Sequence, residues 1–351
     1  MYKELPANFW LPTAEKIAMF DSITAAIRGI SPERQTREFF EAVFGLAKHG
    51  SLPLTFRDGI HEIKAHQPFA LIHGLPHDRA GIDFAPYDNK NPQQQRWEKQ
   101  SHVTEAVLLL YAILRDRNLI TYRTVNQNAD EMAQHHYVSF HDIFPQEKFY
   151  DTQSSRTNGK VDWHQDLAGK RHRPLNVPII GVHVPGDNRI WTVFAQTPDI
   201  LNRLSPKTIA VLMQERFFTP NDVLVTAGDP SLRSEPPHSV FSPDPKTHDM
   251  CYFSKRTRPL RDDDEEAWLA IAQIENVLSD PSIARGIIFQ DGSLLSMNNA
   301  EGVHAKFIEL LTDPSAATLR HLMKSFEIGK KTPPAELVLE QVARKMYVYD
   351  R

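Results

Sequence analysis

The spacing of hydrophobic residues divides the chain into a helical first part and a strand-rich second part. Up to about residue 134, apolar residues recur at intervals of three and four over 14–27 and 34–48, which is typical of helices with one buried face, and 103–115 is also predicted to form a helix. FALIHGLP (69–76) is instead a short apolar run that ends in Gly-Leu-Pro, and it predicts a strand followed by a turn.

From about residue 135 the apolar runs become short and are separated by turn residues. We predict strands at 136–143, 177–184, 190–195, 222–226, 250–254, 286–289 and 293–297. Helices at 198–215 and 262–280 interrupt the strands, and the proline-rich stretch 230–249 predicts a long surface loop of the kind that covers a site. So many short strands predict a β-sandwich or barrel.

The composition is that of an ordinary globular protein, and it limits the classes of partner. The chain has 40 Lys and Arg against 44 Asp and Glu, and its net charge of −4 argues against nucleic acid or an anionic membrane as the partner. The single cysteine, Cys251, excludes an internal disulfide and a thiolate zinc site. The 16 histidines are the unusual feature, because histidine is the commonest protein metal ligand.

No targeting or membrane-spanning segment is predicted. The N-terminus lacks a basic start followed by an apolar stretch, and the apolar run at 106–114 is far shorter than the roughly 20 residues of a membrane helix. We therefore expect a cytoplasmic protein. Because no linker is evident, we expect one domain over 1–351, with a mostly helical part at 1–134, a strand-rich core at 135–330 and a tail at 331–351.

The segment Val161-Asp162-Trp163-His164-Gln165-Asp166 is the first candidate for chemistry. Residues two apart on an extended segment point to the same face, so His164 and Asp166 can direct an imidazole and a carboxylate at one ion. They supply two of the three ligands of the 2-His-1-carboxylate triad, which suits non-heme Fe(II). On its own this short motif is more often solvated or structural.

The remaining members of such a site are more distant in the sequence. His304 follows a predicted strand and is the best-placed second histidine. Arg320, 16 residues further on, suits the far carboxylate of a dicarboxylate such as 2-oxoglutarate, because a planar guanidinium binds carboxylates with two hydrogen bonds. Thr192, on a predicted strand, offers a hydroxyl to the same carboxylate, although a lone strand threonine is usually only a β-former.

Other mechanisms lack their signatures. The chain contains no H-E-x-x-H, G-x-S-x-G, phosphate-loop or dinucleotide-binding motif. Cys251 lies in an apolar segment and is interpreted as an inert hydrophobic residue. His141 precedes the H-x-D segment and is a candidate for the pocket lining, as are His135 and His136.

Taken in order, these motifs resemble the Fe(II)/2-oxoglutarate-dependent oxygenases of the TauD/clavaminate synthase-like family, especially its amino-acid hydroxylase branch. The resemblance covers roughly residues 69–330. It is carried by FALIHGLP (69–76), FHDIFP (140–145), VDWHQD (161–166), the passage from Thr192 to Phe217, SLLSMNNAEGVHAK (293–306) and ATLRHLMKSF (317–326). The fold that it implies is mainly β, a double-stranded β-helix (jelly-roll) core with a helical N-terminal region and helical insertions.

The resemblance also implies roles for named residues. His164, Asp166 and His304 would bind Fe(II), and Arg320 with Thr192 would hold 2-oxoglutarate. Lys324 and His141 would lie near the substrate. Lys324 stands where amino-acid hydroxylases carry a second basic residue for the substrate carboxylate. The basic segment SKRTRPLR (254–261) stands where arginine-specific relatives have acidic residues, so arginine is not the preferred substrate.

The implied reaction is hydroxylation of an unactivated C–H bond in a free amino acid or a molecule derived from one, in specialised metabolism. It would consume O2 and 2-oxoglutarate and release succinate and CO2. Asp166 favours hydroxylation because related halogenases lack this carboxylate. The alternatives are desaturation or cyclisation on the same scaffold, a TauD-like oxygenase of a small sulfonate or organic acid, and, least favoured, a non-catalytic jelly-roll binding protein.

Overall fold

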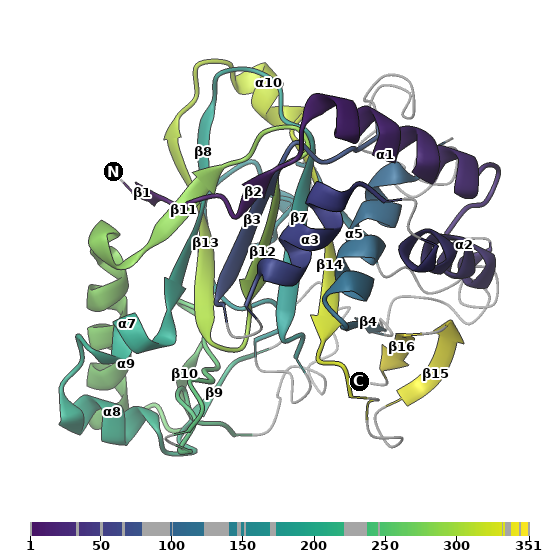
Figure 1. Cartoon of the computed structure of the whole chain (residues 1–351). Helices are drawn as coiled ribbons and strands as arrows, with labels where there is room; N and C mark the ends of the chain where they lie inside the picture. Colours follow the sequence, from purple (N-terminus) through teal and green to yellow (C-terminus); the bar gives the residue numbers. More distant parts are fainter. Residues whose placement is uncertain are drawn as a thin grey trace.

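Two β-sheets face each other at the centre of the molecule, and helices cover their outer faces (Figure 1). This is the jelly-roll core with a helical N-terminal region that the sequence predicts. The computed structural model describes residues 2–32, 35–49, 52–64, 67–78, 99, 101–122, 140–145, 149–150, 152–168, 173–220, 237–244, 246–331, 333, 338–343 and 345–349.

The smaller sheet carries the segments in which the H-x-D motif and the distal histidine lie. Its strand order is β1-β11-β8-β13-β6, and all its pairs except β1 with β11 are antiparallel. The strands are β1 (Lys3–Glu4), β11 (Arg285–Ile288), β8 (Arg189–Gln196), β13 (Gly302–Leu310) and β6 (Val161–His164).

The larger sheet faces it and carries Lys324 on β14. Its order is β15-β16-β4-β14-β7-β12-β3-β2, with β5 paired to β14. The strands are β15 (Val338–Ala343), β16 (Met346–Tyr349), β4 (Asn118–Tyr122), β14 (His321–Ile328), β7 (Asn176–His183), β12 (Leu294–Asn298), β3 (Phe69–His73), β2 (Phe9–Trp10) and β5 (Phe140–Ile143). A further short pair joins β9 (Phe217–Phe218) to β10 (Arg258–Pro259).

Two groups of helices close the outer faces (Figure 1). The larger sheet packs against α1 (Thr13–Ala26), α2 (Thr36–Lys48), α3 (Leu54–Glu62) and α5 (Val103–Leu114) through one apolar cluster. The smaller sheet packs against α7 (Thr197–Leu201), α8 (Pro206–Leu212) and α9 (Glu265–Ser279) through a second cluster. A third cluster lies between the sheets. The short helix α10 (Pro314–Thr318) precedes β14.

Alternation along β8 and β13 decides which side chains reach the interior between the sheets. Trp191, Val193 and Ala195 belong to the cluster under α7–α9. The intervening Phe194 belongs to the cluster between the sheets, and it lies directly opposite His304. Because paired residues of antiparallel strands share a face, His304 also points into the space between the sheets.

The predicted helices are largely confirmed, with one correction. The expected helices at 14–27, 34–48, 103–115 and 262–280 correspond to α1, α2, α5 and α9. The single helix expected at 198–215 is wrong: the chain forms α7 and α8 with a break between them. Pro206 cannot continue a helix because it lacks an N–H, and Ser205 caps the new helix by accepting a hydrogen bond from the Thr208 backbone N–H.

The strand predictions have a more mixed outcome. The runs at 177–184, 190–195, 286–289 and 293–297 form β7, β8, β11 and β12. The run at 250–254 forms only isolated bridges. The run at 222–226, residues 136–139 of another run and residues 230–236 of the proposed cover lie outside the described residues. The C-terminal tail contains β15 and β16, which join the larger sheet.

Part of the proposed surface loop is anchored in the core. Val240 and Phe241 are fully buried and pack in the cluster under α8 and α9, and Phe241 bridges Met250. The described residues on either side of this pair are exposed or half-buried, so the segment lies at the surface but is held to the core at Val240 and Phe241. No helix of the described residues is long and apolar enough to cross a membrane.

Candidate metal centre

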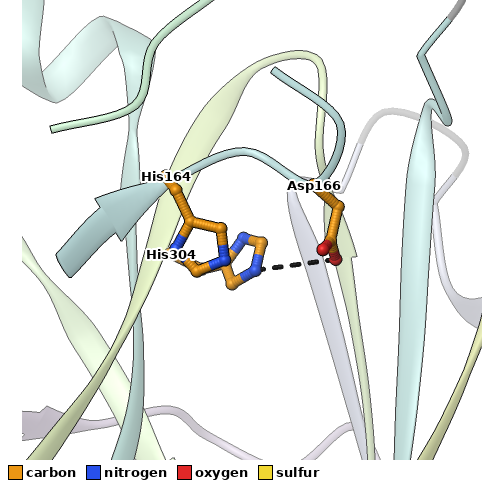
Figure 2. A group of neighbouring side chains, drawn as sticks. All are labelled: His164, Asp166 and His304. Carbon is orange, nitrogen blue, oxygen red and sulfur yellow. Dashed lines mark ion pairs between the residues drawn. The ribbon is translucent and has the colours of Figure 1, made fainter. Parts of the chain in front are cut away.

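His164, Asp166 and His304 converge at one end of the smaller sheet (Figure 2). His164 ends β6, Asp166 follows in the turn, and His304 lies on β13 directly opposite His164. One ligand atom from each side chain can be chosen so that all three atoms lie within 4.8 Å of one another. The three residues are 6–9% exposed, so the site is shielded from bulk water.

The protonation state of both histidines suits metal binding. His164 Nδ1 lies 2.8 Å from the carbonyl oxygen of Asp162 and donates its proton there, which leaves the lone pair of Nε2 for a metal. Burial lowers the pKa of His164. Burial and, to a smaller extent, the adjacent His164 lower the pKa of His304 to about 3. Both imidazoles are therefore neutral near pH 7.

Asp166 presents one oxygen to the protein and the other to the site. Its Oδ1 accepts a hydrogen bond from Lys324 Nζ at 2.6 Å. Its Oδ2 is buried without a hydrogen-bond partner and lies 3.7 Å from His304 Nε2. Burial by itself raises the pKa of Asp166, but the positive charge of Lys324 holds that pKa well below its usual range. Two neutral imidazoles, one carboxylate and an unsatisfied Oδ2 fit a divalent iron ion.

Asn299 and Gln165 position this turn, and neither was singled out from the sequence. Asn299 Oδ1 accepts the Asp166 backbone N–H at 2.8 Å, and its Nδ2 donates to the carbonyl oxygens of Asp166 and Pro174 at 3.1 and 2.9 Å. Gln165 donates to the carbonyl of Ala300 at 3.2 Å. Both are buried. The only sequence signal for Asn299 is its place in the run before the distal histidine.

Arg320 lies deeper between the sheets, beside a small cavity. It is 8% exposed, its Nη2 atom has no hydrogen-bond partner, and its guanidinium carbon is 5.8 Å from the centre of the Phe289 ring. Burial lowers its pKa to about 10, so it remains cationic at neutral pH. Thr192 is buried on β8. Directly opposite it on β13 lies Lys306, a further residue that the sequence did not single out.

Lys306 lines the same cavity as Arg320. Its Nζ donates to the carbonyl oxygen of Thr157 at 2.5 Å. Burial and the nearby Arg320 lower the pKa of Lys306 to about 7. A lysine near the exposed end of a strand usually reaches solvent, so the sequence pattern did not predict that Lys306 would line a cavity.

The two residues predicted to lie near the substrate are neighbours. His141 on β5 is directly opposite Lys324 on β14, so their side chains share a face of the larger sheet. The His141 ring also packs on Phe326, with 4.9 Å between ring centres. The structure therefore brings Lys324 to Asp166 and His141 to Lys324, and a contact of either residue with substrate stays a prediction.

The other histidines have different surroundings. His321 is buried and hydrogen-bonded to Asp142, at 2.9 Å between His321 Nε2 and the carboxylate. His238 Nε2 lies 3.5 Å from Cys251 Sγ, so the buried cysteine has a polar neighbour that the sequence did not suggest. His135 and His136 lie outside the described residues.

Comparison with known proteins places this geometry in context. No protein-family model and no curated protein matches the chain. Among solved structures, asparagine oxygenase in complex with Fe(II), 2S,3S-3-hydroxyasparagine and succinate is 18% identical, with a TM-score of 0.73 over 100% of both chains. The chain has the fold of this oxygenase.

A second non-heme iron oxygenase, OrfP, is similar to the same extent. Its complex with Fe and alpha-ketoglutaric acid is 19% identical, with a TM-score of 0.70 over 93% of this chain and 95% of OrfP. A variant of OrfP in complex with (3S)-hydroxy-L-Arg is 18% identical, with a TM-score of 0.71 over 98% and 100% of the two chains. At these identities the likeness establishes the fold, and the chemistry has to be argued from the site.

Proposed function

We propose that the protein is an Fe(II)- and 2-oxoglutarate-dependent dioxygenase that hydroxylates a free amino acid or a small molecule derived from one. The observation that carries this proposal is the buried group of His164, Asp166 and His304, with ligand atoms within 4.8 Å of one another. A jelly roll with this donor set has the open coordination positions that the reaction needs. The similar solved oxygenases hold Fe, alpha-ketoglutaric acid or succinate, and amino acids, which supports the same class here.

The metal would be held by His164 Nε2, Asp166 Oδ2 and a ring nitrogen of His304. Iron bound there would supply O2 activation coupled to conversion of 2-oxoglutarate to succinate and CO2. The chain's own contribution is orientation. Hydrogen bonds from His164 Nδ1 to Asp162 and from Lys324 to Asp166 Oδ1 fix the two ligands of the H-x-D segment before any metal arrives.

The co-substrate would extend from the metal toward Arg320. The buried guanidinium, with its unpartnered Nη2, is suited to the far carboxylate of 2-oxoglutarate, and Thr192 lines the same inner face of the smaller sheet. The cluster of apolar residues between the sheets excludes water from this space, which strengthens ionic contacts within it.

Lys324 and His141 support an amino acid as the substrate. Lys324 keeps two further N–H donors beyond the one on Asp166, and one of them can bind a substrate carboxylate near the metal. Near His164, the 254–261 segment presents Arg256, whose guanidinium stacks on Phe253, and Phe253 in turn packs on the His164 ring. A basic residue at this place favours a substrate whose side chain is not cationic.

Two further predictions belong to this proposal. Alignment with asparagine oxygenase over 100% of both chains supports a single catalytic domain over 1–351. We also propose a cytoplasmic location, where a reducing environment would keep bound iron in the ferrous state.

A turnover experiment tests the function. The purified protein would be supplied with Fe(II), ascorbate, 2-oxoglutarate and O2 together with a panel of amino acids, small sulfonates and other organic acids. We expect succinate formation that depends on one member of the amino-acid set, and a product heavier by one oxygen atom by mass spectrometry. If succinate forms only with a sulfonate, the substrate belongs to the sulfonate class and not to the amino acids. No succinate above the level of a His164→Ala variant with any compound would contradict the proposal.

A further inference from the structure

Lys306 lies on the same face of β13 as the distal histidine. It is two residues beyond His304, and strand geometry separates such residues by about 7 Å along one face. It lies directly opposite Thr192, so the side chains of Lys306 and Thr192 extend from the same face of the smaller sheet. From the proposed metal position, Lys306 therefore lies about one short dicarboxylate chain further along β13.

Lys306 and Arg320 line one small cavity, together with Ser155, Thr157 and Asn158. Among the described residues, no carboxylate forms an ion pair with either cation. Lys306 donates one hydrogen bond, to the Thr157 carbonyl, and Arg320 leaves Nη2 without an acceptor. The cavity therefore contains several N–H donors and has no anionic partner from the described part of the chain.

A buried guanidinium beside a partly buried ammonium group is physically costly without a counter-ion. Each has lost part of its hydration, and the two charges repel each other at short range. Such a pair becomes favourable when an anion binds between the two groups, since a carboxylate accepts charge-assisted hydrogen bonds at both oxygens. The lining residues that the structure describes include no acidic side chain, which favours an anion supplied by a ligand.

We propose that Lys306 is a second anchor for the far carboxylate of 2-oxoglutarate, with Arg320 bound to one oxygen and Lys306 to the other. This inference rests on the proposed function. Lys306 thereby becomes a binding residue of the co-substrate pocket, beyond the Arg320 and Thr192 pair expected from the sequence. The cavity selects 2-oxo acids that carry a second carboxylate at the far end.

A comparison of two ligands isolates this contact. 2-Oxopentanoate has the same chain length and the same metal-chelating end as 2-oxoglutarate, but it lacks the far carboxylate. Binding of each ligand would be measured by calorimetry under nitrogen with Fe(II)-loaded native protein, Lys306→Met and Lys306→Arg. Lys207→Met serves as the matched control, because the Lys207 side chain is 84% exposed.

We expect Lys306→Met to weaken 2-oxoglutarate binding about 10- to 100-fold, as for loss of a hydrogen bond to a charged group. Binding of 2-oxopentanoate should stay within about twofold in the same variant. Lys306→Arg should retain most of the affinity for 2-oxoglutarate because it keeps the charge. Lys207→Met should bind both ligands as the native protein does.

The inference is overturned if Lys306→Met binds 2-oxoglutarate like the native protein, or if it loses affinity for both ligands equally, since a purely structural residue would do the latter. If circular dichroism shows that Lys306→Met does not fold, Lys306→Gln replaces it in the same comparison. If the native protein itself does not bind 2-oxoglutarate in the presence of Fe(II), the proposed function fails, and the role of Lys306 fails with it.

Discussion

Lys324 and Asp166, 158 residues apart in the sequence, form a buried ion pair in which Lys324 Nζ lies 2.6 Å from Asp166 Oδ1. The pair occupies one carboxylate oxygen and leaves Oδ2 facing His304. A carboxylate held in this way presents a single oxygen to a metal, which is the arrangement of a monodentate ligand.

Replacing Lys324 should therefore weaken metal binding. We expect Lys324→Met to lower the affinity for Fe(II) about tenfold or more, because the ligating carboxylate loses the group that orients it. Fe(II) titration without co-substrate or substrate measures this effect separately from any substrate contact. Lys324→Arg should recover part of the affinity. Unchanged Fe(II) binding together with a raised KM for the substrate would instead assign Lys324 to the substrate carboxylate alone.

The three proposed ligands should be needed for iron binding. We expect His164→Ala and Asp166→Ala to lose stoichiometric Fe(II) binding, measured by metal analysis after desalting under nitrogen, because two ligands do not hold the ion in a facial site. His248→Ala is the matched control, since His248 is exposed. Retention of one iron per chain in either ligand variant would show that the metal is bound elsewhere.

Replacing Arg320 should weaken binding of the co-substrate and leave binding of the metal unaffected. We expect Arg320→Met to weaken 2-oxoglutarate binding about 100-fold or more, because it removes a charged hydrogen-bond donor from a buried pocket. Fe(II) affinity should remain within about twofold. The two affinities are measured on the same preparation. Equal losses of both would indicate a general disturbance of the fold rather than loss of an anchor.

Close backbone contact in the smaller sheet predicts a glycine position that does not tolerate a larger residue. A Cβ atom at Gly286 on β11 would lie 2.6 Å from the carbonyl oxygen of Thr192 and 2.7 Å from Val193 Cγ1. We expect Gly286→Ala to destabilise the protein by about 1–3 kcal/mol in urea unfolding, because the sheet cannot widen locally without loss of packing.

The control for this prediction is Gly45→Ala in α2. A Cβ atom there meets nothing within 4 Å. We expect an increase in stability of about 0.5–1 kcal/mol, since alanine is a better helix former. Equal effects of the two substitutions would contradict the steric explanation.

A buried cluster of charged side chains at the start of α5 predicts that the protein loses stability in acid. Lys99 Nζ lies 3.0 and 2.9 Å from the two oxygens of Glu105, and also contacts Asp78. Burial alone raises the pKa of Glu105, but Lys99 outweighs it and holds that pKa below its usual range. A depressed pKa contributes stability above the unfolded pKa of about 4.3, and this contribution is lost as the pH falls below that value.

Unfolding in urea between pH 7 and pH 3 measures this effect. We expect Glu105→Gln to lower the stability at pH 7 by about 3 kcal/mol, because Lys99 loses a buried partner. The variant should also lose less stability than the native protein between pH 5 and pH 3. Glu41→Gln, at an exposed position, should leave the curve unchanged. Parallel pH curves for Glu105→Gln and the native protein would rule out this source of acid sensitivity.

The sequence predicted secondary structure correctly where a single hydrophobic pattern extends over the whole helix or strand. The intervals of three and four in 34–48 correspond to α2, and the short apolar run at 190–195 corresponds to β8. The prediction failed where two signals competed. At 198–215 the apolar spacing suggested one helix, but α7 ends at Leu201 and a second helix begins at Pro206, capped by Ser205.

The kinds of ligand available were evident from the sequence alone, because an imidazole and a carboxylate two residues apart in VDWHQD (161–166) can reach one ion. Only the tertiary structure decided which distant residues join them. Pairing of β13 with β6 and β8 brings His304 to His164 and Lys306 to Thr192. These pairings depend on register across the five-stranded smaller sheet, and the register is set by packing of both faces rather than by any local spacing of residues.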